Sequence, residues 1–220
     1  MSPRFCQIPK PVMNKYCLLF LLVGLTIACH KSSVPASNMV FPNQIGDQWV
    51  YEYSLSGNPA ADTGTIQVDV VGQTVLPDGE TAKVWVTSYS NVPNYPDTSL
   101  VVDSSSTVKI YFNNICPDCT DKMPEEWKRY NFPLQVSDEW IYNLNDTTTV
   151  LNELNLQVPA GNFPNTFQLS RTVGYVTNSF TRDTIFITPA VGITKYFQDE
   201  FSLGPFSGNG LWELASYRLK

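Results

Sequence analysis

Two segments of this 220-residue chain carry the same motif, and this repetition constrains the fold more than any other feature. Residues 41–53 read FPNQIGDQWVYEY and residues 132–144 read FPLQVSDEWIYNL, so Phe, Pro, Gln, Asp, Trp and Tyr recur in register. Such a repeat indicates two supersecondary units of one plan that bury a common core. Weaker matches follow at residues 63–73 and 148–157, 81–89 and 165–173, and 108–112 and 193–197. The repeat therefore predicts two halves, residues 41–115 and 132–220, joined by a connector at residues 116–131.

The hydrophobic period within each half is that of β-strands. Apolar Ile66, Val68 and Val70 alternate with polar Gln67 and Asp69, which places the two sets on opposite faces of a strand. LPDG (76–79) and PAGN (159–162) supply turn residues between such runs. We predict an all-β domain over residues 41–220: one antiparallel, strongly curved sheet or partial barrel, made of two meanders of about four strands each. Residues 124–130 are the one place where a short helix is expected, with Pro124 in its first turn.

Each copy of the motif places an Asp two residues before a Trp. We interpret Asp47 and Asp138 as turn residues that bond their own backbone, and Trp49 and Trp140 as the first buried anchor of each meander. The alternative is that the Trp residues stack on a ligand. In that case the concave face of the sheet would be lined by Trp49, Trp85, Trp140 and Trp212.

The N-terminus has the pattern of an export signal. The uncharged run from Cys17 to Ala28 follows Lys15, and it is shorter than the roughly 20 apolar residues that a membrane-spanning helix needs. We predict a signal peptide over residues 1–28, with translation starting at Met1 or at Met13.

The signal ends in TIAC, which resembles a lipobox, with Ala28 immediately before the cysteine. This predicts Cys29 as the lipid attachment site and the means of contact with a membrane. An ordinary secretory peptide with an incidental cysteine is the alternative. The small polar residues of the segment 29–40 predict a flexible tether.

Residue types that carry catalysis are scarce in the predicted domain. The chain has one His, His30, and it lies on the tether, so the domain has no imidazole for general base catalysis or metal binding. The adjacent pairs Asp138–Glu139 and Asp199–Glu200 would face opposite sides of a strand. The expectation is a non-enzyme without cofactor or metal.

Cys116 and Cys119 form a C-x-x-C pair in the connector. In an oxidising compartment a local disulfide is the favoured outcome, since a redox-active pair needs a helix N-terminus in a βαβ setting and zinc needs further ligands. Redox catalysis, metal binding and free thiols are the alternatives.

The charge of the chain argues against nucleic acid as a partner. The formal net charge is −6. The charged residues that would be lost with residues 1–28 are all basic: Arg4, Lys10 and Lys15. An acidic surface repels a phosphate backbone.

Four short motifs give the chain a resemblance to a group of lipoproteins common in Bacteroidota, for which no activity is established. They are GDxWxY at 46–51, VPAGxF at 158–163, PxVGIxKY at 189–196 and LxSY at 214–217. The resemblance implies a lipid-anchored protein of the cell envelope. Since no acidic run follows Cys29, the outer membrane with the domain on its periplasmic face is expected.

Some members of this group are similar in strand plan to periplasmic lipoprotein carriers, in which an incomplete β-barrel surrounds an apolar cavity. The resemblance therefore implies a non-catalytic binding protein for an apolar or amphipathic ligand. The alternative is a structural or interaction module with a filled core and a protein or glycan partner. Fold similarity by itself does not decide between them.

Overall fold

The computed structural model describes residues 41–56, 63–91, 93, 96–112, 123–143, 145–174, 180–201 and 209–220. The predicted signal peptide, the lipidation site Cys29, the tether and the pair Cys116 and Cys119 lie outside these ranges. Within them the chain forms β1 (Gln48–Ser56), β2 (Thr63–Val75), β3 (Thr81–Tyr89), β4 (Asp97–Asp103), β5 (Thr107–Phe112), β6 (Glu126–Asn131), β7 (Glu139–Asn143), β8 (Asp146–Val158), β9 (Gly161–Gly174), β10 (Phe180–Thr188), β11 (Gly192–Phe201) and β12 (Asn209–Arg218). In this described part of the chain, no helix has the length and hydropathy needed to span a membrane.

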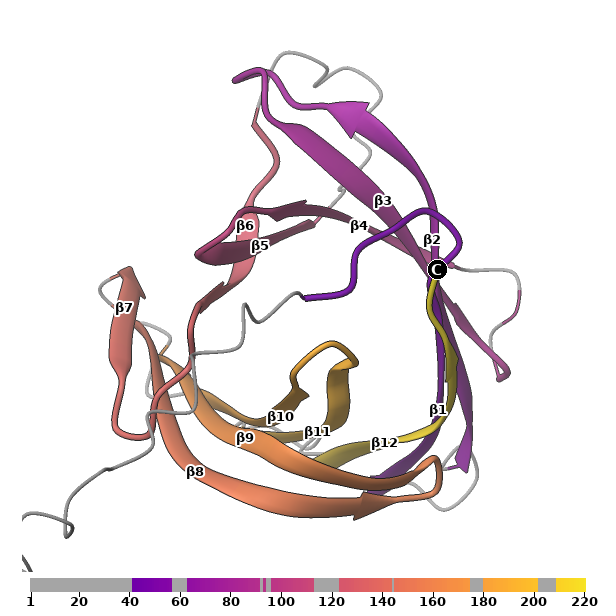
Figure 1. Ribbon diagram of the computed structural model, residues 1–220, viewed down its shortest axis with the longest axis vertical. Coiled ribbons are helices and arrows are strands. Elements are labelled where there is room, and N and C mark those ends of the chain that lie inside the picture. Colours follow the sequence, from indigo (N-terminus) through magenta and orange to yellow (C-terminus); the bar gives the residue numbers. More distant parts are fainter. Residues whose placement is uncertain are drawn as a thin grey trace, which may run out of the picture. The chain divides into compact units, whose positions relative to one another are not determined.

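The strands of the described residues form one antiparallel sheet in the order β6-β5-β4-β3-β2-β1-β12-β11-β10-β9-β8-β7. The first and last strands meet in its centre, where β1 pairs with β12 from Gln48 opposite Arg218 to Ser56 opposite Asn209. The sheet curves into a nearly closed barrel whose two edges are β6 and β7 (Figure 1). The prediction of an all-β domain built on one strongly curved antiparallel sheet is confirmed.

The predicted number of strands is wrong, because the described residues form six strands before residue 132 and six after it. Apolar and polar residues do not alternate along β4, because Leu100, Val101 and Val102 are all buried. Val101 faces the main core, whereas Leu100 and Val102 pack in a smaller cluster with Leu76, Ala82 and Tyr111. A strand covered on both faces shows no alternation.

The short helix expected over residues 124–130 is also wrong, since Glu126–Asn131 form β6 and pair with β5. Lys128 and Tyr130 are buried, and the residues on either side of each are half-buried, which is the period of a strand. The sequence conceals this pattern because a buried position is occupied by Lys, a residue type that is rarely buried unless it is paired.

The two motif turns have the same hydrogen bonds. Asp47 Oδ2 accepts from the Gln44 N–H at 2.7 Å, and Asp138 Oδ2 accepts from the Gln135 N–H at 3.1 Å. In each turn the residue before the Asp has a positive φ, 99° at Gly46 and 76° at Ser137. Both Asp side chains therefore bond the backbone of their own turn.

The two turns differ in burial. Asp47 is 2% exposed and its Oδ1 also accepts from the Lys220 N–H at 2.8 Å, so it joins the first turn to the last residues of the chain. Asp138 is exposed.

We expect Asp47→Ala to lower the free energy of unfolding by about 1–3 kcal/mol, because two backbone N–H groups lose their acceptor at a buried site. Asp138→Ala removes the equivalent bond at an exposed site, so its loss should be smaller, about 0.5–1 kcal/mol. Urea denaturation of the two variants measures the difference. Equal losses would show that the link to Lys220 adds no stability.

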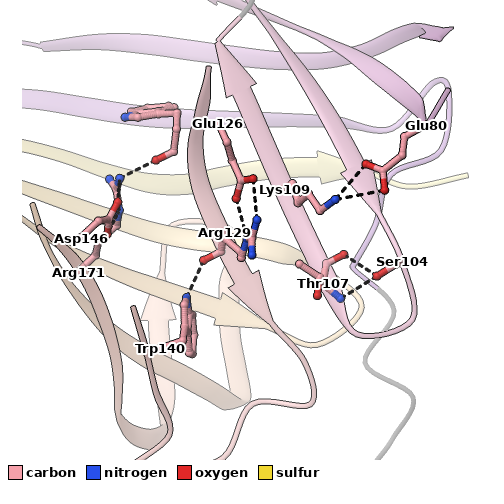
Figure 2. A network of polar contacts seen from close by, with 10 residues as sticks. Glu80, Ser104, Thr107, Lys109, Glu126, Arg129, Trp140, Asp146 and Arg171 are labelled. Carbon is pink, nitrogen blue, oxygen red and sulfur yellow. Dashed lines mark hydrogen bonds and ion pairs between the residues drawn. The ribbon is translucent and has the colours of Figure 1, made fainter. Parts of the chain in front are cut away.

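The free edge of β6 is bridged to the other half by side chains. The Arg171 guanidinium of β9 donates to the Trp127 carbonyl at 2.6 Å, and Trp140 Nε1 of β7 donates to the Arg129 carbonyl at 3.0 Å. Figure 2 shows the second of these bonds beside the Glu126–Arg129 ion pair. Two carbonyls that face away from β5 thus find donors without a neighbouring strand.

Candidate functional site

A cavity of about 790 Å³ lies on the concave side of the sheet. Residues from β1 to β6 and from β11 and β12 line it, together with Pro96, which directly precedes β4. Aromatic rings dominate the wall: Tyr51, Trp85, Tyr89, Phe112, Trp127, Tyr196 and Trp212. The lining includes exposed residues, Pro96, Asp97 and Phe112, and buried ones, so the cavity runs from the surface into the core.

Two of the four predicted tryptophans line this cavity. Trp85 is held from behind, because its Nε1 donates to Asn43 Oδ1 at 2.7 Å and its ring stacks on Phe41 at 6.1 Å. Trp212 packs against Tyr196 with ring centroids 5.3 Å apart. With the indole N–H of Trp85 bonded inside the protein, that ring contributes apolar surface to the wall.

The other two predicted tryptophans lie away from the cavity. Trp49 is 1% exposed, lies against Trp85 at 5.1 Å and donates from Nε1 to the Val191 carbonyl at 2.7 Å. Trp140 packs against the core beside Arg129. Trp49 is the buried anchor that was predicted, whereas Trp140 is only half-buried.

The residues that the sequence did not reveal are Lys128, Trp127 and Tyr196. Lys128 lines the cavity and is 5% exposed. Its Nζ lies 4.0 Å from the centre of the Trp127 ring and 4.1 Å from the centre of the Tyr196 ring, so two aromatic faces contact the ammonium. Asp97 is the other charged residue of the wall, and it accepts a hydrogen bond from Tyr89 Oη at 2.8 Å.

Lys128 belongs to a buried cluster of four charged groups. Arg171 Nε lies 3.1 Å from both oxygens of Asp146, and Arg171 Nη1 lies 3.1 Å from Asp183 Oδ2. Lys128 Nζ lies 3.7 Å from the same Asp183 oxygen. Two cations and two carboxylates balance, which is the condition under which ions can be buried at all. The Arg171–Asp146 pair is seen in Figure 2.

Burial affects the protonation of this cluster. Removal from water lowers the pKa of Lys128 to about 8, although Asp183 opposes this effect. Burial also raises the pKa of Tyr130 and of Tyr196 above the ordinary value. The negative charge of Asp183 also raises the pKa of Tyr196, although Tyr196 Oη does not meet hydrogen-bonding geometry. Within the described residues, Tyr130 Oη, Tyr196 Oη and Asp183 Oδ1 are buried without a hydrogen bond.

The arrangement offers a ligand a broad aromatic wall with a cationic group set into it. In the part of the chain that is described, no three His, Cys, Asp or Glu side chains lie close enough to hold a metal ion. The groups that line the cavity are ring faces, aliphatic side chains, a few hydroxyls, the Gln198 amide, the Asp97 carboxylate and the Lys128 ammonium.

Comparison with known proteins gives two remote structural similarities. One is to a predicted exported protein with a YmcC-like fold from Bacteroides fragilis, at 13% identity and a TM-score of 0.49, covering 82% of this chain and 99% of that one. The other is to a predicted lipoprotein from Parabacteroides distasonis, at 14% identity and a TM-score of 0.47, covering 81% and 97%. No protein family and no curated protein matches the sequence. TM-scores below 0.5 do not establish a shared fold, so the site must be interpreted from this chain's own residues.

Arg171→Met should destabilise the protein by about 3–5 kcal/mol, because it leaves two buried carboxylates, Asp146 and Asp183, in a cluster whose remaining cation is Lys128. The double variant Arg171→Met/Asp146→Asn restores the charge balance, and we expect it to be more stable than the single variant. Urea unfolding at pH 7 measures both. A loss below about 1 kcal/mol for Arg171→Met would contradict the role assigned to this cluster.

The lowered pKa of Lys128 makes the free energy of unfolding rise with pH between pH 8 and pH 10. Between pH 8 and pH 10 the unfolded chain keeps a proton on this lysine, whose ordinary pKa is 10.5, while the folded chain releases it. The unfolded state then binds more protons, so stability rises with pH, by about 2 kcal/mol over this window. Above pH 10 the buried tyrosines, with raised pKa values, reverse the trend.

The measurement is the free energy of unfolding from pH 7 to pH 10 for the wild type and for Lys128→Met. We expect the difference between the two proteins to follow the titration of one group near pH 8. Parallel curves would contradict the lowered pKa of Lys128.

Proposed function

We propose that this chain is a lipid-anchored protein of the cell envelope whose β domain binds an apolar or amphipathic ligand without catalysis. The observation that carries the proposal is the cavity of about 790 Å³ with its aromatic wall. Its volume falls within the range of about 300–1,000 Å³ found for small-molecule sites, and such sites combine apolar walls with a few polar groups.

The lipid anchor is supported by sequence. The run up to Ala28 suits a signal peptide, and Cys29 follows it in the TIAC motif. An anchor on Cys29 would hold the domain at a membrane surface through the tether, on the periplasmic face of the outer membrane in our proposal. A carrier or receptor of amphipathic molecules works where these molecules partition.

A structural or interaction module of the envelope is the competing proposal. Such a module needs a filled interior, because rigid packing rather than ligand binding is its task. A hollow bounded by Trp85 and Trp212 weighs against it.

Native mass spectrometry of residues 30–220 tests the proposal. This fragment contains every described strand, and residues 38–220 form a compact unit of their own. We expect a bound amphiphile that dissociates when the protein is denatured. Protein that is always empty, and that takes up no added amphiphile, would contradict ligand binding.

Neighbouring residues of β3 supply a matched pair of variants. Thr87 lines the cavity and Ser88 does not, since successive side chains point to opposite faces. Thr87→Phe should fill the cavity and reduce ligand occupancy, whereas Ser88→Phe should leave occupancy unchanged. Equal occupancy in the two variants would place the ligand elsewhere.

A further inference from the structure

We propose that Lys128 binds the acidic head group of the cavity's ligand, which makes the ligand class a single-chain amphiphile with a carboxylate or similar anionic head. This inference rests on the proposed function and deepens it. The geometry that carries it is an ammonium group in the wall of an aromatic cavity, which lies 3.7 Å from Asp183 Oδ2.

An ammonium has three N–H donors and no acceptor. Lys128 Nζ lies 3.7 Å from Asp183 Oδ2, which is longer than a hydrogen bond, and its other described contacts are two ring faces. Ring faces attract a cation but do not replace the oxygen acceptors that it has in water. A buried group of this kind favours a ligand that brings an oxygen acceptor.

The charged groups around Lys128 come from several strands. Asp183 on β10 faces it directly, Arg171 on β9 and Asp146 on β8 lie behind Asp183, and the Tyr196 ring of β11 covers one side. Asp183 is closer to Arg171, at 3.1 Å, than to Lys128. Lys128 is thus the cation of the cluster that is bound least closely and the one that lines the cavity.

The choice of an acid over an alcohol follows from the strength of the bond. A hydrogen bond between an ammonium and a carboxylate is about twice as strong as one between neutral groups. The remaining negative charge of the wall, Asp97, is exposed and is therefore screened by solvent and salt. The chain of the amphiphile would lie along Trp85, Ile110 and Trp212.

The experiment compares dodecanoate with dodecan-1-ol, two probes of equal chain length that differ in charge. Binding to lipid-free residues 30–220 is measured at pH 7 by isothermal titration, below the micellar concentration. We expect dodecanoate to bind at least about tenfold more tightly than the alcohol. Lys128→Met should remove this preference, Lys128→Arg should keep most of it, and the surface control Lys83→Met should change neither affinity.

A second variant controls for the change in net charge of the buried cluster that Lys128→Met causes. Lys128→Met/Asp183→Asn removes one charge of each sign, so its buried cluster stays neutral, and the preference for dodecanoate should still be absent. Cooperative melting identifies the variants that fold.

The outcomes separate the two proposals. Equal affinity of the wild type for both probes, or a preference that survives in Lys128→Met or in the double variant, overturns the role of Lys128 and leaves the cavity as an apolar site. Failure of the wild type to bind either probe overturns the binding of single-chain amphiphiles and counts against the proposed function as well.

Discussion

The contacts of the Arg171 guanidinium are the constraint on which the arrangement of the candidate site depends. Arg171 lies on β9, and its guanidinium contacts Asp146 on β8, Asp183 on β10 and the Trp127 carbonyl on β6. In the order of the sheet, β6 and β9 are separated by most of the other strands. Arg171 therefore holds the free edge of β6 to the opposite wall, together with Trp140. Lys128, the next residue of β6 after Trp127, lines the aromatic cavity.

One part of the barrel interior is a packed core, and another part is the cavity. Leu169, Ile185 and Leu214 are fully buried, and they fill the region around β9, β10 and β12 as an ordinary core. Large flat rings surround the cavity instead, and some of them make hydrogen bonds to the protein, as Tyr51 does to the Ile193 carbonyl at 2.9 Å. Rings fixed in this way can border a hollow without collapsing into it, since movement would leave their polar atoms unpaired.

The sequence predicted the features that depend on local chemistry. Strand alternation along residues 63–73 and the turn residues of LPDG were sufficient for the class of fold, and the Asp side chains of the two motif turns bond as expected. Two features could not be predicted. β4 shows no alternation because both of its faces are buried, and β6 has a lysine at a buried position. The carboxylate that permits this burial, Asp183, lies more than 40 residues away along the chain.

The candidate site shows the same limit. The tryptophan content of the chain suggested an aromatic wall, and Trp85 and Trp212 are part of it, but nothing in the sequence distinguishes them from Trp49, which packs behind Trp85. The cation of the site was hidden because its charge is balanced by residues of other strands. Long-range pairing of charges is a property of the folded sheet, and no local pattern encodes it.

The central claim is that Lys128 is an enclosed ammonium that faces the cavity, and titration of this single group tests it most directly. NMR of the protein labelled with ¹³C at lysine Cε follows each lysine with pH, and the Lys128→Met variant assigns the resonance. The account predicts that in ligand-free protein this resonance titrates with a pKa of about 8. A resonance that instead titrates near the ordinary value of 10.5 would contradict it.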